Sequence, residues 1–212
     1  MCVVERAVNG MWKENCYVVS NKKRECVIID PGSDGKKIIN YIGDNKLDVL
    51  AILNTHGHYD HIGAVEMLRK RLNVPFYLHS ADMKIMKKAN LYLRLFDGSN
   101  NKITIPEVDN FVDKVKIPIE LGNFRMDVLY TPGHTPGGVC YMLEGCLFSG
   151  DTLFKNGIGR VDLPGGDMND LLSSLKRLRD IPSKTKLYPG HGEVSTIGEE
   201  IKNNEELLRG IK

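Results

Sequence analysis

The chain opens with short apolar runs that are rich in β-branched residues and are each closed by a polar or glycine-containing turn. Runs of this length and composition predict β-strands. In the first half the expected strands are 3–8, 16–20, 26–30, 49–54 and 76–79. Between them, apolar residues recur at helical spacing, as at Ile62, Val65 and Leu68, and predict helices. Ser33 is the expected N-cap of the helix that runs through Ile42.

The second half repeats the order of a short strand followed by a polar turn. The expected strands are 126–130, 146–148 and 186–188, and the expected helices are about 169–178 and 197–208. Residues 91–112 mix leucines and Phe96 with polar residues, and we interpret them as an insert between the halves. Two mostly β halves that are each flanked by helices predict two packed sheets with helices on their outer faces.

Length, composition and charge indicate a single globular domain, and they do not indicate which reaction the protein catalyses. With 212 residues, of which 42% are hydrophobic, residues 1–212 are expected to form a single domain with a substantial core. The formal net charge of +2 and the pI near 8.2 give no electrostatic case for nucleic-acid binding. No apolar run approaches the roughly 18 residues that a membrane span needs, so no membrane association is expected.

The five cysteines indicate a reducing compartment. Their number is odd, they form no C-x-x-C pair, and three of them lie inside strand-like apolar runs. They are therefore interpreted as reduced core residues. The N-terminus lacks the basic start and long apolar stretch of a secretory signal. We expect a cytoplasmic protein, and the sequence leaves its oligomeric state open.

The candidate chemistry lies in the turn that follows the strand at 49–54. This turn holds His56, His58, Asp60 and His61, and a tight turn can aim such side chains in two directions. Neutral imidazoles and carboxylates are ligands of Zn²⁺, Fe²⁺ and Mn²⁺. Three further ligand-type residues follow later strands in glycine-containing turns, namely His134, Asp151 and His191. Seven such residues in equivalent positions predict a metal site.

Seven nitrogen and oxygen ligands are the set that a two-metal hydrolase needs. Only a carboxylate offers two oxygens to ions roughly 3.5 Å apart, so Asp151 is the expected bridge. The expected division is His56, His58 and His134 on the first metal, with Asp60, His61 and His191 on the second. The predicted cofactors are two divalent transition metals, with zinc preferred and iron or manganese as alternatives.

The reaction expected of such a site is hydrolysis. A water held between two ions loses a proton near neutral pH, because the metals lower its pKa from 15.7 to about 7. The metal-bound hydroxide is then the nucleophile, with Asp60 and Asp151 as the carboxylates of the catalytic site. No serine or cysteine nucleophile is required.

These motifs carry a resemblance to a known family. The H-x-H-x-D-H sequence is followed by a T-P-G-H-T-P-G turn around His134, a G-D-T-L-F turn at Asp151 and a late G-H at His191. In order and spacing they resemble the metallo-β-lactamase superfamily. The resemblance implies an α+β fold, a four-layer αββα sandwich, with the metal site along one edge of the two sheets.

Within the superfamily, segments 148–154 and 157–167 are similar to those of the short glyoxalase II-like hydrolases. This resemblance implies hydrolysis of a small-molecule thioester such as S-D-lactoylglutathione. The longer glyoxalase II enzymes add a C-terminal helical domain with much of the glutathione-binding surface. This sequence ends about twenty residues after His191, so that domain is not expected here, and the thiol carrier stays open.

Arg160 is the expected substrate-binding residue. It resembles the position at which glyoxalase II enzymes place a cation on the thiol carrier, and a guanidinium can grip a carboxylate or carbonyl through paired hydrogen bonds. The alternative is structural, because Arg160 could instead pair with Asp162 or Asp167 and hold its loop.

Other functions stay in view at this stage. A mononuclear-iron persulfide dioxygenase is the main alternative, because His56, His58, His134 and Asp151 would serve one Fe²⁺ equally well. A β-lactamase of the familiar class typically carries Cys at the position of Asp151 and lacks His61 as a ligand. A tRNA-processing nuclease would need a substrate-gripping arm and a basic surface.

Several residues outside the seven have two interpretations. Asp30 is either a turn residue or a carboxylate that orients a ligand imidazole, and Tyr59 faces either the pocket or the core. His79 is interpreted as a hydrogen-bonded residue at a helix start, and Trp12 as packing near the N-terminal hairpin. Residues 91–112 either wall the pocket or form a small core under a loop.

Overall fold

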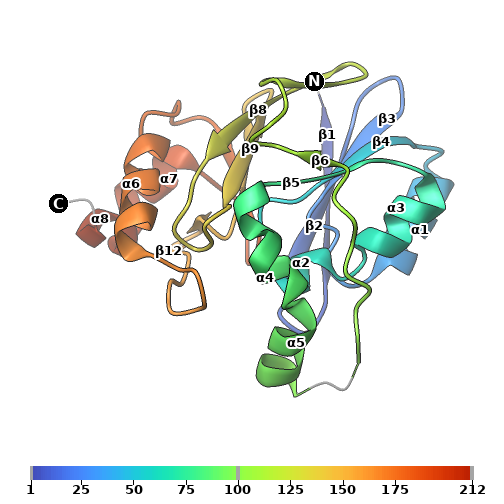
Figure 1. The fold of residues 1–212 in the computed structure, drawn as a ribbon. Coiled ribbons are helices and arrows are strands. Elements are labelled where there is room, and N and C mark those ends of the chain that lie inside the picture. Colours follow the sequence, from blue (N-terminus) through green and yellow to red (C-terminus); the bar gives the residue numbers. More distant parts are fainter. Residues whose placement is uncertain (1, 99–100, 211–212) are drawn as a thin grey trace.

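Two mixed β-sheets pack face to face in the computed structural model, which describes residues 2–98 and 101–210 (Figure 1). The first sheet has the strand order β1-β2-β3-β4-β5-β6. Its strands are β1 Val3–Asn9, β2 Glu14–Ser20, β3 Glu25–Ile29, β4 Asp48–Leu53, β5 Phe76–Leu78 and β6 Asn110–Phe111. The first three strands are antiparallel neighbours, whereas β3 to β6 run parallel.

The second sheet has the strand order β14-β13-β10-β9-β8-β7. Its strands are β7 Ile119–Leu121, β8 Phe124–Tyr130, β9 Val139–Leu143, β10 Cys146–Gly150, β13 Lys186–Pro189 and β14 Ser195–Thr196. Strands β10 and β13 are parallel, and the other neighbours are antiparallel. A small separate hairpin follows β10, formed by β11 Leu153–Phe154 and β12 Gly157–Ile158.

Helices cover the outer faces of both sheets (Figure 1). Beside the first sheet lie α1 Gly35–Asp44, α2 Tyr59–Ile62, α3 Val65–Leu72, the short 3₁₀ helix η1 Ser80–Asp82, α4 Met83–Lys87 and α5 Ala89–Asp97. Beside the second sheet lie α6 Met168–Leu178, α7 Ile197–Asn203 and α8 Glu205–Gly210. None of the described helices combines the length and the apolar character that crossing a bilayer requires.

Strand β2 shows how the sequence builds these layers. Successive side chains of a strand point to opposite faces, so Cys16 and Val18 pack with the helices outside the first sheet, while Tyr17 and Val19 pack between the sheets. A third cluster joins the second sheet to α6 through Leu147, Leu171, Leu175 and Leu187. Three apolar clusters thus separate four layers, and the predicted αββα sandwich is confirmed.

The start of α1 differs from the expectation. Asp34, rather than Ser33, is the N-cap, because its Oδ1 accepts a hydrogen bond from the Lys37 backbone N–H at 3.3 Å. The Ser33 hydroxyl instead donates to the Glu14 carboxylate at 2.6 Å. Both residue types favour N-caps, and the neighbouring hairpin, which the sequence pattern did not place there, decides between them.

Of the segment interpreted as an insert, residues 91–98 and 101–112 are described, and they belong with the first sheet. They include most of α5 and a stretch from 101 that leads into β6, the strand at the edge of that sheet, while residues 99–100 lie outside the described part. Asp109 fixes this segment, since its carboxylate accepts two hydrogen bonds from the Arg69 guanidinium, both at 2.7 Å, and one from the Phe76 backbone at 2.9 Å.

Candidate metal centre

The first four predicted ligands lie where β4 ends. His56 and His58 are in the extended turn, whereas Asp60 and His61 belong to the one-turn helix α2, which the sequence pattern did not predict. Because α2 turns the chain after His58, the two pairs of side chains point to different places. The change from extended backbone at His58 to helical backbone at Tyr59 therefore separates the two metal groups.

The other three residues follow strands of the second sheet: His134 comes after β8, Asp151 after β10 and His191 after β13. Two glycines bring Asp151 into place. Gly150 has a positive φ of 49° and lies against Thr55, and a Cβ at Gly190 would collide with the Asp151 carboxylate. A side chain at Gly190 would displace the carboxylate, and one at Gly150 would clash with Thr55.

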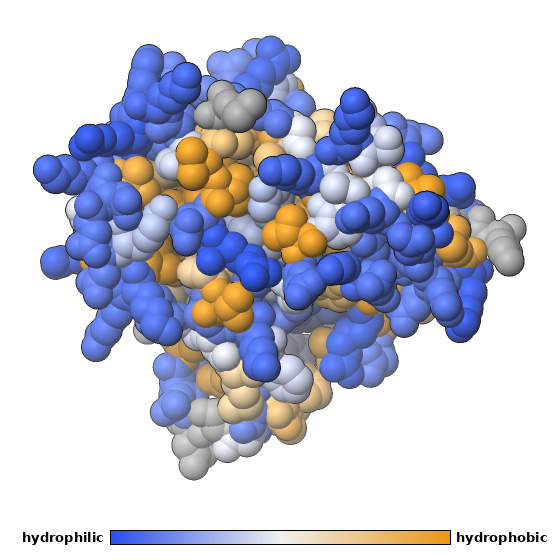
Figure 2. Space-filling view, turned by 180° about the vertical axis from the view of Figure 1, so that it is seen from behind, coloured by the Kyte–Doolittle hydropathy of each residue, from blue (hydrophilic) through white to orange (hydrophobic). Residues whose placement is uncertain are grey.

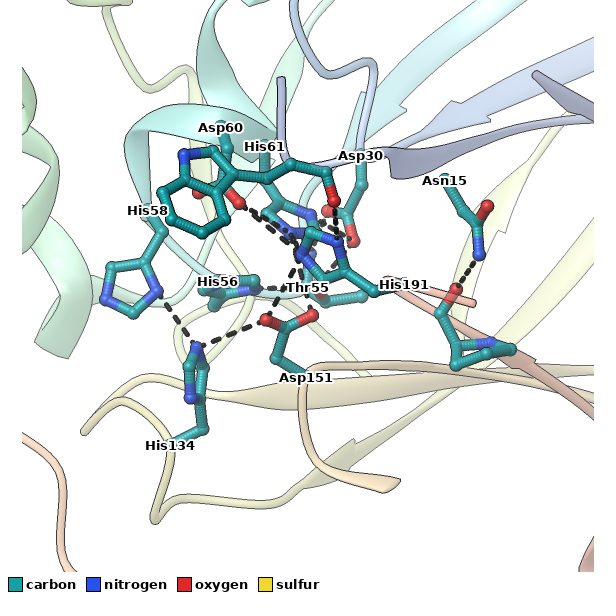
Figure 3. Close-up of polar contacts among 12 residues, drawn as sticks. Asn15, Asp30, Thr55, His56, His58, Asp60, His61, His134, Asp151 and His191 are labelled. Carbon is teal, nitrogen blue, oxygen red and sulfur yellow. Dashed lines mark hydrogen bonds and ion pairs between the residues drawn. The ribbon is translucent and has the colours of Figure 1, made fainter. Parts of the chain in front are cut away.

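All seven residues converge at one edge of the two sheets (Figure 3). They supply two groups of three whose ligand atoms lie within 4.8 Å of one another, namely His56, His58 and His134, and Asp60, His61 and His191. Asp151 lies between the groups. Its carboxylate oxygens are 3.4 Å from His134 Nε2, 3.6 Å from His61 Nε2 and 3.5 Å from His191 Nε2.

Hydrogen bonds on the outer side of the imidazoles set which nitrogen faces the centre. His134 Nδ1 lies 2.7 Å from the Arg160 carbonyl oxygen, and His191 Nδ1 lies 3.0 Å from the Trp12 carbonyl oxygen. Because a carbonyl only accepts, each Nδ1 carries the proton and each Nε2 is left with a lone pair. Both Nε2 atoms point into the groups described above.

Asp30 orients two further imidazoles. Its carboxylate accepts hydrogen bonds from the Thr55 backbone and hydroxyl at 2.8 and 2.6 Å. The Thr55 hydroxyl therefore accepts from His56 Nδ1, 3.0 Å away, and Asp30 Oδ2 also lies 3.2 Å from His61 Nδ1. Of the two interpretations of Asp30, the geometry supports the carboxylate that holds ligand rings in place.

The inner atoms of the centre fit divalent metal ions. His58 Nδ1 and His134 Nε2 face each other at 2.9 Å. Within the described chain, His56 Nε2 and Asp151 Oδ1 are buried without a hydrogen-bond partner. Leaving such atoms unpaired is costly, and a cation among them would satisfy their lone pairs. Nitrogen and carboxylate donors in this number suit zinc, iron or manganese.

Electrostatics in the centre also favour cations. Burial lowers the pKa of His56 well below its ordinary value and lowers that of His58 to about 3, so both rings are neutral, as ligands must be. Burial alone would likewise lower the pKa of His61, yet the nearby Asp60, Asp151 and Asp30 raise it to about 10. The same three carboxylates would attract a metal ion.

Asp82 connects the turns that carry the ligands, and the sequence pattern did not predict this role. This buried carboxylate accepts hydrogen bonds from the Gly57 N–H at 2.9 Å, the Gly137 N–H at 2.6 Å and the Thr135 hydroxyl at 2.8 Å. Gly57 lies between His56 and His58, and Thr135 follows His134. Asp82 therefore fixes the first ligand turn against the turn of the second sheet.

A pocket of about 290 Å³ opens above the centre. Its floor includes His58, Asp60, His134, Asp151 and His191. Its walls are largely apolar and aromatic, and are formed by Trp12, Tyr59, Tyr92, Phe96, Phe154, Ile158, Leu163 and Pro164. Arg160 also lines the pocket. Tyr59 thus faces the pocket, and α5 walls it.

The remaining predicted residues are also placed. His79 is the N-cap of η1, where its Nδ1 accepts from the Ala81 N–H at 3.2 Å, and its ring stacks on Tyr130. Arg160 donates two hydrogen bonds of 2.7 Å to Asp162. Arg160 is therefore both at the pocket and paired within its loop, and its role in substrate binding stays a prediction.

A family comparison agrees with this geometry. Residues 10–191 match the model of the metallo-beta-lactamase superfamily. The chain belongs to this superfamily. The match spans all seven candidate ligands, from the turn that carries His56 to the one that carries His191.

Relatives in the superfamily extend over nearly the whole chain. The probable metallo-hydrolase YqgX of Bacillus subtilis (strain 168) is 37% identical over 202 residues, which are 92% of each chain. The hydroxyacylglutathione hydrolase GloC of Haemophilus influenzae is 30% identical over 197 residues, which are 91% of this chain and 92% of its own.

Solved structures of the superfamily match the fold closely. The structure of BLEG-1, a B3 metallo-beta-lactamase, has a TM-score of 0.91 at 37% identity and covers 97% of this chain and 99% of its own. TTHA1623 in a di-iron-bound form has a TM-score of 0.82 at 38% identity, with 94% and 98% coverage. These likenesses establish a metallo-hydrolase family and leave the substrate open.

Proposed function

We propose that this chain is a two-metal hydrolase that cleaves small-molecule thioesters. The observation that carries the proposal is the position of Asp151, whose carboxylate reaches two complete three-residue groups on the floor of a pocket. The 30% identity to the hydroxyacylglutathione hydrolase GloC supports a glyoxalase II-like activity.

In this proposal His56, His58 and His134 would hold the first metal, Asp60, His61 and His191 would hold the second, and Asp151 would be shared between them. When bound, the two metals would activate a water molecule as the nucleophile and polarise the acyl carbonyl. Zinc is the preferred metal, and the di-iron-bound form of TTHA1623 makes iron the first alternative.

The residues of the chain position the groups that react. Asp30 and the Trp12 and Arg160 carbonyls hold the imidazoles, and Asp60 and Asp151 complete the floor. In hydrolysis the water oxygen forms a bond to the acyl carbon, the carbon–sulfur bond breaks, and the thiolate leaves and is protonated from solvent. A thiolate leaves without acid assistance, which suits a pocket where the Tyr59 hydroxyl already donates to Asp97.

A second candidate is β-lactam hydrolysis, which the likeness to BLEG-1 favours. Both reactions begin with attack on an acyl carbon. The amide nitrogen of a β-lactam, however, is a poorer leaving group that needs a proton as the ring opens. We therefore place thioesters first and include a β-lactam in the test.

The experiment combines elemental analysis of purified protein with turnover of a panel containing acyl thioesters, a cephalosporin and a persulfide. We expect two transition metals per chain, thioester cleavage that stops on chelation and returns with added metal, and no oxygen consumption. One tightly held iron with oxygen uptake on the persulfide would instead show the mononuclear dioxygenase. Metal-dependent cleavage of the cephalosporin alone would favour the lactamase.

We further propose that Arg160 anchors the substrate, exchanging part of its pairing with Asp162 for a carbonyl or carboxylate. Arg160 is 56% exposed and lies at the pocket, which leaves it accessible to a ligand. Arg160→Ala should then raise KM by about 10-fold with little change in kcat or metal content, since uniform binding is lost. A lower metal content or Tm with an unchanged KM would show a purely structural role.

A further inference from the structure

The walls of the pocket contain little that could bind a highly charged substrate. Among the described residues that line it, Arg160 is the one lysine or arginine, and its guanidinium is already paired with Asp162. The other wall residues come from the turn at Trp12, from Tyr59 in α2, from α5 and from segment 154–164, and they are mostly aromatic or aliphatic.

Helix α5 protrudes from the body of the molecule (Figure 1). In the view from behind, this protruding part shows hydrophobic and weakly polar side chains among the hydrophilic ones (Figure 2). Its exposed hydrophobic residues are Leu91, Leu95 and Phe96. Phe96 also lines the pocket, and its ring stacks on that of Tyr92. The helix therefore presents an aromatic surface to anything that reaches the metal groups.

One carboxylate holds the aromatic wall together. Asp97 Oδ1 accepts hydrogen bonds from the Trp12 indole N–H at 2.6 Å and from the Tyr59 hydroxyl at 2.8 Å. These three residues come from the N-terminal hairpin turn, from α2 and from the end of α5. Asp97 thus joins three separate segments into one wall, and it does so outside the metal groups.

We infer that the substrate places an apolar group against this wall and carries at most one anionic group. The inference rests on the thioester hydrolysis proposed above and narrows its substrate class. An apolar group of the substrate is stabilised by contact with the aromatic rings. Arg160 can pair with one carboxylate or phosphate. Any further anionic group would lose its hydration water in the pocket and find no cation there, which disfavours binding. Asp97 is then a positioning residue that sets this preference.

The test compares one acyl group on three thiols: N-acetylcysteamine, which is small and uncharged, glutathione and coenzyme A. A second comparison places lactoyl and 3-phenylpropanoyl groups on N-acetylcysteamine. We expect kcat/KM to be at least about 10-fold higher for N-acetylcysteamine than for glutathione, and higher for the phenylpropanoyl group than for the lactoyl group. A 10-fold preference for glutathione or coenzyme A would overturn the inference and leave the hydrolase intact, whereas no metal-dependent turnover of any thioester would refute the proposed function.

Variants of Asp97 test the wall itself. Asp97→Ala should raise KM for the phenylpropanoyl thioester about 10-fold while kcat and metal content stay unchanged. The reason is that Asp97 holds the side chains of Trp12 and Tyr59, whereas His191 is held by the backbone carbonyl of Trp12. Asp97→Asn keeps an acceptor oxygen and should stay near the wild-type KM. Asp44→Ala, at the exposed end of α1, is the matched control. An unchanged ratio of KM values between the two acyl groups in Asp97→Ala would overturn the assignment of Asp97.

Discussion

The metal centre and the pocket wall above it are built in different ways. The candidate ligands lie directly after strands or in the first turn of a helix. Their rings are held by hydrogen bonds to a threonine and to backbone carbonyls, and by the buried Asp30 carboxylate beside His61. The wall consists of side chains from a hairpin turn, a surface helix and a loop, joined by Asp97. Substitutions of wall side chains should therefore alter selectivity more than chemistry, while the backbone carbonyls of Trp12 and Arg160 belong to both regions.

The largest effect should come from Asp151→Ala, which removes the carboxylate that, among the described residues, lies between the two metal groups. We expect both ions to be held more weakly and kcat/KM to fall by more than about 100-fold, since even residues behind the ligands cost 10- to 100-fold. Elemental analysis of the dialysed variant measures the loss. Asp127→Ala, an exposed carboxylate on β8, is the control. Loss of only one ion would show that Asp151 does not bridge.

The next effect should come from Asp82→Ala, which leaves the buried Gly57 and Gly137 N–H groups without their acceptor. Each buried N–H group without an acceptor should lower the free energy of unfolding by about 1–3 kcal/mol. The loosened turns should also weaken metal binding by roughly 10-fold. Chelator competition and thermal unfolding report the two effects. Asp113→Ala removes a carboxylate that binds Ser80 at the same segment and should lower stability alone. Unchanged metal affinity in Asp82→Ala would contradict its role in holding the ligand turns.

A smaller and more selective effect is expected at the wall. Phe96→Ala should change KM between short and long acyl chains by about 3- to 10-fold, because one apolar side chain discriminates by this order. Phe96 is 44% exposed, so Tm should change little. Leu95→Ala, on the same helix, 64% exposed and outside the pocket lining, is the matched control. A large fall in Tm with an unchanged substrate profile would assign Phe96 to packing instead.

The smallest effect concerns stability and acid. The Arg69 guanidinium beside Asp109 holds the pKa of that carboxyl below its usual range. A carboxyl with a lowered folded pKa stabilises the fold above its unfolded pKa near 4, and this stability is lost as the pH falls through the folded value. Asp109→Asn should lower the free energy of unfolding by about 1 kcal/mol at pH 7 and by less at pH 3. Equal destabilisation at both pH values would mean that the charge of Asp109 contributes nothing.

The sequence was sufficient to predict the layers and the seven candidate ligands. A continuous apolar run such as that at 16–19 specifies a strand that is buried on both faces. Ligand-type residues that follow such strands converge because strand ends share an edge. The resemblance of the H-x-H-x-D-H turn to the superfamily then implied the αββα order, which the structure confirms.

The residues that support the site could not be predicted in the same way. Asp82 and Asp97 occur singly in helical segments, and nothing in the local pattern shows that Gly137 or Trp12 lies beside them. Strand β9 was also missed, although Glu144 and Gly145, both with positive φ, form the tight turn that joins it to β10. Such contacts depend on tertiary packing. A buried polar residue has a signal in sequence only when its partner is also close in sequence.

The hydrogen bond between the Trp12 carbonyl and His191 has a consequence for synthesis in the cell. It joins residues 179 positions apart, and the Asn15 backbone N–H also donates to Gly190 at 2.7 Å. The first hairpin leaves the ribosomal exit tunnel long before His191 does. For most of translation the nascent chain therefore lacks the residue that pairs with Trp12 and completes the second metal group. Contacts of such long range form late. Full metal loading should therefore be one of the last events in maturation. A pulse of metal given to stalled nascent chains should fill the group of Asp60, His61 and His191 only after residue 191 has emerged.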